Sequence, residues 1–177
     1  MTEIVNRCSK TNQVINDVNE VVEIQLESGK SDGLLAKIKE VNGLTGGVIE
    51  SYSPLSLAYI GDSIYALVAK TIVVERGNCP ANELHRKTVN YVSAVAQAKI
   101  VRYLTDEGLL SDKEADVLRR GRNAKSSSVA KNASVIDYRL ATGLEALVGY
   151  LYLTNNSDRM IEILKIGFDM LDSEKAN

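Results

Sequence analysis

The chain contains no tryptophan, one phenylalanine, two prolines and one histidine among its 177 residues. With so few prolines, long helices can run without interruption. A single histidine cannot supply the repeated Glu-x-x-His pairs of a di-iron helical bundle, nor a histidine-rich zinc site. His85 is therefore expected at the surface rather than in a catalytic role.

Other absences restrict the compartment and the chemistry. Cys8 and Cys79 are far apart and form no Cys-x-x-Cys motif, which is typical of a reducing compartment. The N-terminus lacks the apolar core of a secretory signal, and we find no run of ~18 apolar residues that could span a bilayer. These features predict a cytoplasmic protein outside the membrane. Neither a P-loop motif nor a Gly-x-Ser-x-Gly motif occurs, so we expect no nucleotide cofactor and no serine hydrolase.

The net charge of −2 hides an uneven distribution. Residues 1–50 carry eight acids and five bases, whereas residues 76–131 carry eleven bases and six acids. The positive charge is therefore local, and the net charge alone argues against a general polyanion binder.

The pattern of apolar residues predicts an all-α protein, because no segment alternates as a strand does. Serine caps mark several starts: Ser53 precedes Pro54, and Ser111 opens the capping box Ser-Asp-Lys-Glu. Helices are expected over 54–75, 82–92, 93–107, 111–120, 134–153 and 157–171.

Residues 1–46 differ from the rest and are expected to form an N-terminal extension of unknown role. Two amphipathic stretches, 14–27 and 33–42, precede the glycine-rich NGLTGG. We expect the main domain to occupy residues 47–177, and no internal repeat is seen.

Two carboxylates interrupt the most apolar segments of the chain. Asp62 lies in LSLAYIGDSIYALVA and Glu145 in ATGLEALVGYLYL. A helix that is apolar on every face is expected to be buried, and a buried carboxylate is paired, protonated or bound to metal. If the two helices meet, Asp62 and Glu145 can share a divalent cation. Gly61 suits a close helix approach beside Asp62, and Thr142 and Gly149 would leave room beside Glu145.

Each of these residues also has a purely structural explanation. Gly61 can simply ease packing while Asp62 caps a neighbouring helix. Glu145 can be a buried acid paired with Arg139 or another base.

A basic stretch follows the fourth expected helix. Residues 119–131, RRGRNAKSSSVAK, contain five cations and no acid, and we expect most of them to form a polar loop. A second acid-free tract begins at His85 and adds Arg86, Lys87, Lys99 and Arg102. Basic tracts near a metal site favour a nucleic-acid backbone as ligand, although a charged run can also be a solvated loop.

These motifs resemble the ribonuclease III family. LSLAYIGDSIY is similar to its signature helix and LEALVGYLYL to its second acidic helix. ELHRKTVNYVSAVAQAK and LRRGRNAKS resemble the small bacterial Mini-ribonuclease III branch. The resemblance covers roughly residues 52–172. It implies a homodimeric, Mg²⁺-dependent endoribonuclease that cuts double-stranded RNA, matures precursor 23S rRNA and lacks the double-stranded-RNA-binding domain of the larger enzymes.

The resemblance also implies roles for individual residues. Asp62 takes the place of the signature aspartate and Glu145 that of the essential glutamate, as catalytic residues and metal ligands. Where the larger enzymes carry further acids, this chain has Leu55, Ala58 and Thr142, as the Mini branch does, and Glu83 is a candidate additional acid. The expected RNA-binding residues are His85, Arg86, Lys87, Arg119, Arg120, Arg122, Lys125 and Lys131.

Two other functions are consistent with parts of the sequence. A ribonuclease III-like domain with few acids could be a non-catalytic RNA-binding or ribosome-assembly module, but the retention of Asp62 and Glu145 disfavours this. A helical protein-interaction scaffold would leave the basic stretch unexplained.

Overall fold

The computed structural model describes residues 33–125 and 134–176 of the chain. Within these residues the secondary structure is helical and contains no strand, as the apolar pattern predicts. The chain divides into two compact units between Leu44 and Thr45. In the first unit the described element is α2 (Leu34–Val41), a short helix within the amphipathic stretch 33–42. The stretch 14–27 lies outside the described residues.

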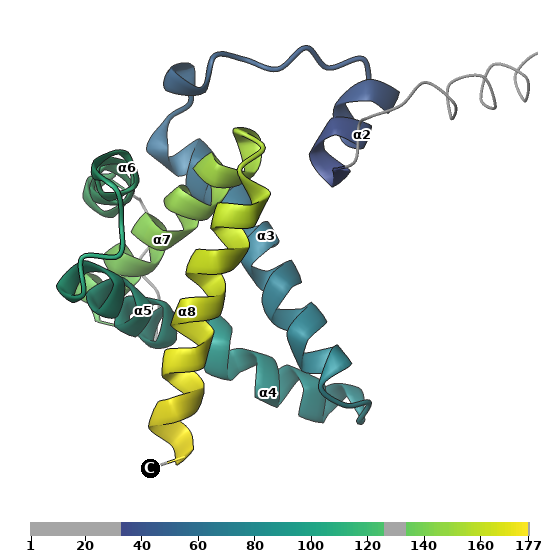
Figure 1. Ribbon diagram of the computed structural model, residues 1–177, viewed down its shortest axis with the longest axis vertical. Helices are drawn as coiled ribbons and strands as arrows, with labels where there is room; N and C mark the ends of the chain where they lie inside the picture. The colour runs from purple at the N-terminus through teal and green to yellow at the C-terminus, as the bar shows by residue number, and fades with distance from the viewer. Residues whose placement is uncertain (1–32, 126–133, 177) are drawn as a thin grey trace, which may run out of the picture. The chain divides into compact units, whose positions relative to one another are not determined.

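The second unit is a bundle of six helices preceded by a 3₁₀ turn, η1 (Ile49–Ser51) (Figure 1). Its α-helices are α3 (Pro54–Glu75), α4 (Ala81–Val92), α5 (Ala94–Asp106), α6 (Asp112–Asn123), α7 (Val135–Leu153) and α8 (Ser157–Ala176). α7 packs against α3, α5, α6 and α8 and supplies much of the core. The rings of Tyr65 and Tyr91 meet Phe168 edge-on, with centroids 5.5 and 5.0 Å apart.

The serine caps predicted from the sequence are present. Ser53 accepts a hydrogen bond from the backbone N–H of Ser56, and Ser134 accepts one from that of Asp137. These side chains satisfy donors that the first turn of a helix leaves free. The predicted capping box of α6 is also confirmed, because Ser111 and Glu114 bond to each other's backbone N–H.

Glu114 has a second role as the anchor of α6 on α8. Its buried carboxylate accepts a hydrogen bond of 2.9 Å from Nε of Arg159. The same guanidinium also donates to the carbonyl oxygen of Leu109, at 2.7 Å. The hydrogen bond from Arg159 is the main reason why the pKa of Glu114 is lowered. The start of α6 is thus fixed to the start of α8 and to the preceding loop.

Two helix ends differ from the prediction. α6 continues to Asn123, so Gly121 and Arg122 are helical rather than part of a loop. α8 continues to Ala176, five residues beyond the expected end. The reason in α6 is packing: a Cβ on Gly121 would lie 2.6 Å from that of Ala146 on α7. This glycine therefore permits a close helix contact instead of ending the helix.

α3 is long and apolar enough to cross a membrane, by length and composition alone. The sequence prediction that no segment meets this condition is therefore wrong. A core helix of a soluble protein passes the same test, and α3 packs against α4, α6 and α7. One face of α3 remains open, however, and carries Leu55, Tyr59, Leu67 and Val74.

Candidate active site

The two candidate carboxylates come together where α3 crosses α7. A Cβ on Gly61 would lie 1.8 Å from the backbone carbonyl oxygen of Glu145. Similarly, a Cβ on Gly149 would lie 2.0 Å from the carbonyl oxygen of Leu57. Two glycines, one on each helix, thus allow the backbones to touch. The predicted close approach beside Asp62 is confirmed, and the backbone in contact is that of Glu145.

The role predicted for Thr142 and Gly149 needs correction. Both lie on the inner side of α7, but Gly149 accommodates the backbone of α3 rather than leaving space for a carboxylate. The hydroxyl of Thr142 donates to the carbonyl oxygen of Tyr138 within its own helix.

Glu145 is a largely buried acid without an ion pair among the described residues. Burial and the nearby charge of Asp62 raise the pKa of Glu145 from 4.5 to about 7, whereas a hydrogen bond from Gln97 lowers it. The expected pairing with Arg139 is absent. A carboxyl group with such a pKa is half protonated near neutral pH when no cation is present.

Asp62 is exposed, which contradicts the expectation that both acids are buried. It lies at the edge of the open face of α3 and makes no hydrogen bond or ion pair with the described part of the chain. Asp62 therefore does not cap a neighbouring helix. The sequence prediction failed because an apolar helix face that remains at the surface has the same composition as a buried one.

The pair has the chemistry expected of a divalent-cation site. Two carboxylates that repel each other are stabilised by a cation between them, and Mg²⁺ commonly uses one or two carboxylates while it keeps several waters. Gln97 also presents a buried Oε1 that has no hydrogen-bond partner among the described residues. These groups fit Mg²⁺ held by Asp62 and Glu145.

Glu83 is not a third member of this site. It forms ion pairs with Lys87 at 3.1 Å and with Arg86 at 3.8 Å. Within residues 33–125 and 134–176, no cluster of three or more histidine, cysteine or acidic side chains could hold a metal ion. The hypothesis that Glu83 adds an acid to the site is therefore wrong.

The candidate RNA-binding residues lie on two helices. His85 and Arg86 are exposed on α4, and Lys87 is half-buried there. Arg119, Arg120 and Arg122 are exposed on the last turns of α6, with Lys125 just beyond, and Lys131 lies outside the described residues. Several cations are already paired, because Arg119 contacts Asp116, Arg102 contacts Asp137 and Lys99 contacts Glu174.

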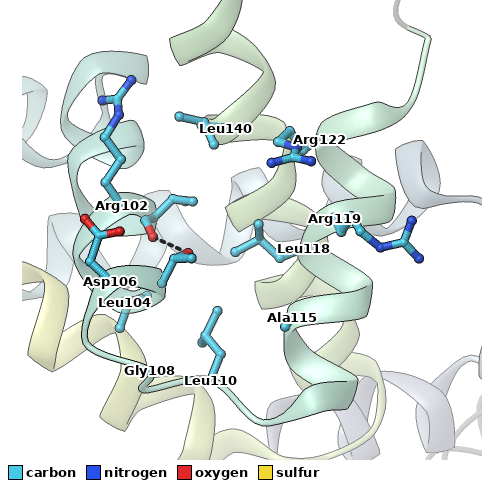
Figure 2. A pocket seen from close by; sticks show the side chains of 12 residues that line it. Arg102, Leu104, Asp106, Gly108, Leu110, Ala115, Leu118, Arg119, Arg122 and Leu140 are labelled. Carbon is cyan, nitrogen blue, oxygen red and sulfur yellow. Dashed lines mark hydrogen bonds between the residues drawn. The ribbon is translucent and has the colours of Figure 1, made fainter.

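A separate hollow of about 400 Å³ opens between α5, α6 and α7 (Figure 2). Its interior is apolar, with Leu104, Leu118 and Leu140, while Arg119 and Arg122 lie at the α6 side. It contains one acid, Asp106, and neither member of the carboxylate pair. The hollow is therefore not the candidate metal site.

Two residues near the carboxylates were not singled out from the sequence. Gln97 donates from Nε2 to Oε1 of Glu145 at 3.3 Å. Tyr65 is fully buried, donates to the carbonyl oxygen of Tyr91 at 2.9 Å, and has a pKa raised by burial and by Glu145. The available signal for Gln97 was an amide among the buried positions of the helix AVAQAKIVRYL.

Removal of the Glu145 charge should stabilise the metal-free protein in a pH-dependent way. In the folded chain the pKa of Glu145 is about 7, against 4.5 for an unperturbed glutamate. The unfolded chain therefore binds fewer protons between these values, and the free energy of unfolding falls as the pH rises from 4.5 to 7. Glu145→Gln should remove this loss, which amounts to roughly 3 kcal/mol at most.

Urea unfolding in a chelating buffer provides the measurement. Glu145→Gln should be more stable than the unchanged chain at pH 8 and equally stable at pH 4. Glu50→Gln, at an exposed position, serves as the matched control and should change neither value. Equal stability of Glu145→Gln and the unchanged chain at both pH values would contradict the burial of this charge.

Comparison with known proteins gives the fold and the site a class. The sequence model described as the Ribonuclease III domain matches residues 55–156, which include both Asp62 and Glu145. The structure is also similar to the crystal structure of protein FN1578 from Fusobacterium nucleatum, with a TM-score of 0.61 and 26% identity. That similarity covers 68% of this chain and 95% of the other.

The most informative relatives are bacterial Mini-ribonuclease 3 proteins. The protein of Thermoanaerobacter sp. strain X514 is 46% identical over 129 residues, which are 73% of this chain and 89% of the relative. Those of Clostridium tetani and Symbiobacterium thermophilum are 40% and 44% identical, over 73% and 67% of this chain and 85% and 90% of theirs. The chain belongs to the Mini-ribonuclease 3 family and is an endoribonuclease.

The family supplies coarser properties as well. Ribonuclease III enzymes generally depend on a divalent metal ion, act on double-stranded RNA and are dimeric. The rival interpretations as a non-catalytic module or an interaction scaffold are therefore not supported.

Proposed function

We propose that this protein is a Mg²⁺-dependent endoribonuclease of double-stranded RNA, with Asp62 and Glu145 as catalytic residues and metal ligands. The observation that carries the proposal is the α3–α7 crossing, where the charge of Asp62 acts on the buried carboxylate of Glu145. The chain keeps two repelling acids at a helix contact, which is costly unless a cation neutralises them.

The residues of the chain divide the work between them. Asp62 is exposed, so a phosphate of the substrate can approach it, whereas Glu145 is held from behind by the helix crossing. When Mg²⁺ is bound, it supplies positive charge at the scissile phosphate and lowers the pKa of a bound water. Since Leu55, Ala58 and Thr142 replace further acids, this chain offers a minimal carboxylate set.

We further propose a homodimer formed through the open face of α3. Its apolar side chains include Tyr59, which is 82% exposed, and Leu67, which is 50% exposed. An apolar face of this kind is typical of an interface, and Asp62 lies along it. A two-fold dimer would place one active site on each strand of a duplex.

The substrate proposal rests on the charges around the site. Double-stranded RNA is recognised by shape and through phosphate and 2′-OH contacts rather than by base sequence. Arg119, Arg120, Arg122, Lys125 and Lys131 are proposed to hold phosphates on the α6 side, and His85, Arg86 and Lys87 on the α4 side. We propose precursor 23S rRNA as the natural substrate, in the cytoplasm, with no nucleotide cofactor and no membrane.

A cleavage assay tests the proposal. A labelled RNA duplex and its separate strands are incubated with the full chain, with Mg²⁺ or with a chelator. We expect cleavage of the duplex in the presence of Mg²⁺ alone. Binding of the duplex without cleavage at any divalent-ion concentration would instead indicate a non-catalytic RNA-binding module.

The arginines of α6 should contribute to RNA binding through the phosphate backbone. The triple variant Arg119→Ala, Arg120→Ala, Arg122→Ala should weaken duplex binding irrespective of sequence. Each lost phosphate contact should reduce the slope of log affinity against log salt concentration by roughly 0.7–0.9. The total should fall below three contacts, because Arg119 already pairs with Asp116. Fluorescence anisotropy across a salt series gives the slope.

A charge-matched control separates this effect from net charge. Lys99, Lys165 and Lys175 each pair with an acid of the described chain, and their triple alanine variant loses the same charge. It should keep a slope close to that of the unchanged chain. If both triple variants lower the slope equally, or neither does, the α6 arginines make no specific phosphate contacts.

The first 46 residues should be dispensable for cleavage. The family match begins at residue 55, and the compact unit that contains the site begins at Thr45. A chain that starts at Gly47 keeps Tyr52, whose hydroxyl accepts a hydrogen bond from the Gly47 nitrogen at 3.2 Å. It should remain dimeric and cleave duplex RNA at least as well as the full chain, since residues 1–50 carry a net charge of −3.

Gel filtration, thermal melting and the cleavage assay measure this outcome. Aggregation of the shortened chain, or a melting temperature several degrees lower, would mean that the removed residues cover apolar surface of the catalytic unit. Loss of the dimer or of cleavage would also refute the prediction.

A further inference from the structure

The side chain of Gln97 is the buried polar group nearest to the proposed metal ligands that the mechanism does not use. It lies in the first turn of α5, after the N-cap Ser93, and is only 2% exposed. A buried amide normally has all its donors and acceptors paired, because each unpaired group costs about 1–3 kcal/mol. The partners of its two polar atoms therefore indicate its role.

The amide nitrogen is fully paired. Nε2 of Gln97 donates to the carbonyl oxygen of Val92 at 3.2 Å and to Oε1 of Glu145 at 3.3 Å. Both partners are acceptors, so the amide can satisfy them only with its nitrogen on this side. The orientation of the carboxamide is thus fixed between the α4–α5 junction and the carboxylate on α7.

The amide oxygen has the opposite status. Oε1 of Gln97 is buried and has no hydrogen-bond partner within residues 33–125 and 134–176. It belongs to the same planar group as Nε2, so it lies close to the carboxylate of Glu145. A carbonyl oxygen placed there can accept a hydrogen bond from a water molecule, and a site that holds Mg²⁺ also holds several waters.

We infer that Gln97 is a positioning residue for the metal site, an inference that rests on the proposed function. Its nitrogen holds one oxygen of Glu145 and leaves the other to face the ion together with Asp62. Its oxygen accepts from a water of the site. Groups that orient metal ligands without touching the metal commonly change metal affinity by 10–100-fold when they are replaced.

The alternative is that Gln97 only fastens α5 to the end of α4 through Val92. Such a structural role would change the stability of the protein but not its affinity for metal. The two roles therefore differ in a measurement made without RNA and without catalysis.

The experiment compares Mn²⁺ binding by the full-length chain and by Gln97→Met, using electron paramagnetic resonance or calorimetry. Methionine has a similar length but neither donates nor accepts strongly. We expect a 10–100-fold loss of Mn²⁺ affinity in Gln97→Met. Thr88→Val is the matched control: Thr88 is 5% exposed, and its hydroxyl donates to the Leu84 carbonyl within α4. It should lose some stability and keep its Mn²⁺ affinity.

Cleavage provides a second readout. In Gln97→Met the half-saturating Mg²⁺ concentration should rise by the same factor as the Mn²⁺ dissociation constant. The KM for duplex RNA at saturating Mg²⁺ should stay within about 3-fold of the unchanged chain, because phosphate contacts come from other helices. If Gln97→Met does not fold, Gln97→Asn retains an amide that is one methylene too short and should show the same loss of Mn²⁺ affinity.

Unchanged Mn²⁺ affinity in a folded Gln97 variant would overturn the inference. Failure of the proposed function has a different signature, since Asp62→Asn would then bind Mn²⁺ as tightly as the unchanged chain. If Asp62→Asn loses Mn²⁺ binding while Gln97→Met retains it, the metal site stands and Gln97 is structural.

Discussion

Asp62→Asn should abolish Mg²⁺-dependent cleavage of duplex RNA, with a loss of roughly 10³-fold or more in kcat/KM. The substitution keeps the size of the side chain and removes the charge that, with Glu145, is proposed to hold Mg²⁺. Metal stabilisation of transition-state charge amounts to several kcal/mol, and each 1.36 kcal/mol corresponds to about tenfold in rate. Asp62 makes no hydrogen bond with the described residues, so the fold should be unaffected.

The assay should be accompanied by gel filtration and thermal melting of the metal-free protein. The variant should retain its oligomeric state and melt no lower than the unchanged chain, because removal of Asp62 relieves the repulsion on Glu145. Asp106→Asn, an exposed aspartate at the end of α5, is the matched control and should cleave normally. Near-normal cleavage by Asp62→Asn would refute the assignment of the metal site.

Gly61→Ala should have the second largest effect, on the fold and on activity together. Alanine normally stabilises a helix interior by about 1 kcal/mol relative to glycine. Here its Cβ would lie 1.8 Å from the carbonyl oxygen of Glu145, which is backbone and cannot rotate away. α3 and α7 must therefore move apart, and overpacking of this kind costs typically 1–3 kcal/mol or more.

The expected result is a lower melting temperature and a cleavage rate reduced by at least tenfold, since the helix shift also separates Asp62 from Glu145. Thermal melting and the duplex assay measure both. Ser63→Ala, on the exposed side of the same helix, should change neither quantity. If Gly61→Ala were as stable and as active as the unchanged chain, the helices would not touch at this glycine.

The sequence was sufficient to predict the helical fold and the carboxylate pair, because both depend on local signals. Serine caps and the capping box fix the helix starts through hydrogen bonds within four residues. Asp62 and Glu145 stand out because each interrupts an apolar helix. The family resemblance added their proposed roles.

The failures concern contacts between distant segments. Gly121 was taken for the start of a loop, whereas it permits close packing of α6 on α7 at Ala146. Asp62 was expected to be buried, because composition does not distinguish a core face from an open one. Gln97 escaped notice because its partner Glu145 lies 48 positions further along the chain. The assignment of residues 1–46 as an extension and of the basic residues as RNA ligands remains a prediction.

The anchoring of α6 has a consequence for the entropy of RNA binding. Arg119, Arg120 and Arg122 project from a helix whose first turn is fastened to α8 through Glu114 and Arg159. Their backbone is ordered before any ligand arrives, whereas a loop would lose about 1–2 kcal/mol of conformational freedom per residue on binding. Cations at the carboxyl end of a helix are also favoured by its dipole. The arginines therefore form a preorganised surface on which only side-chain rotations remain to be restricted by a phosphate backbone.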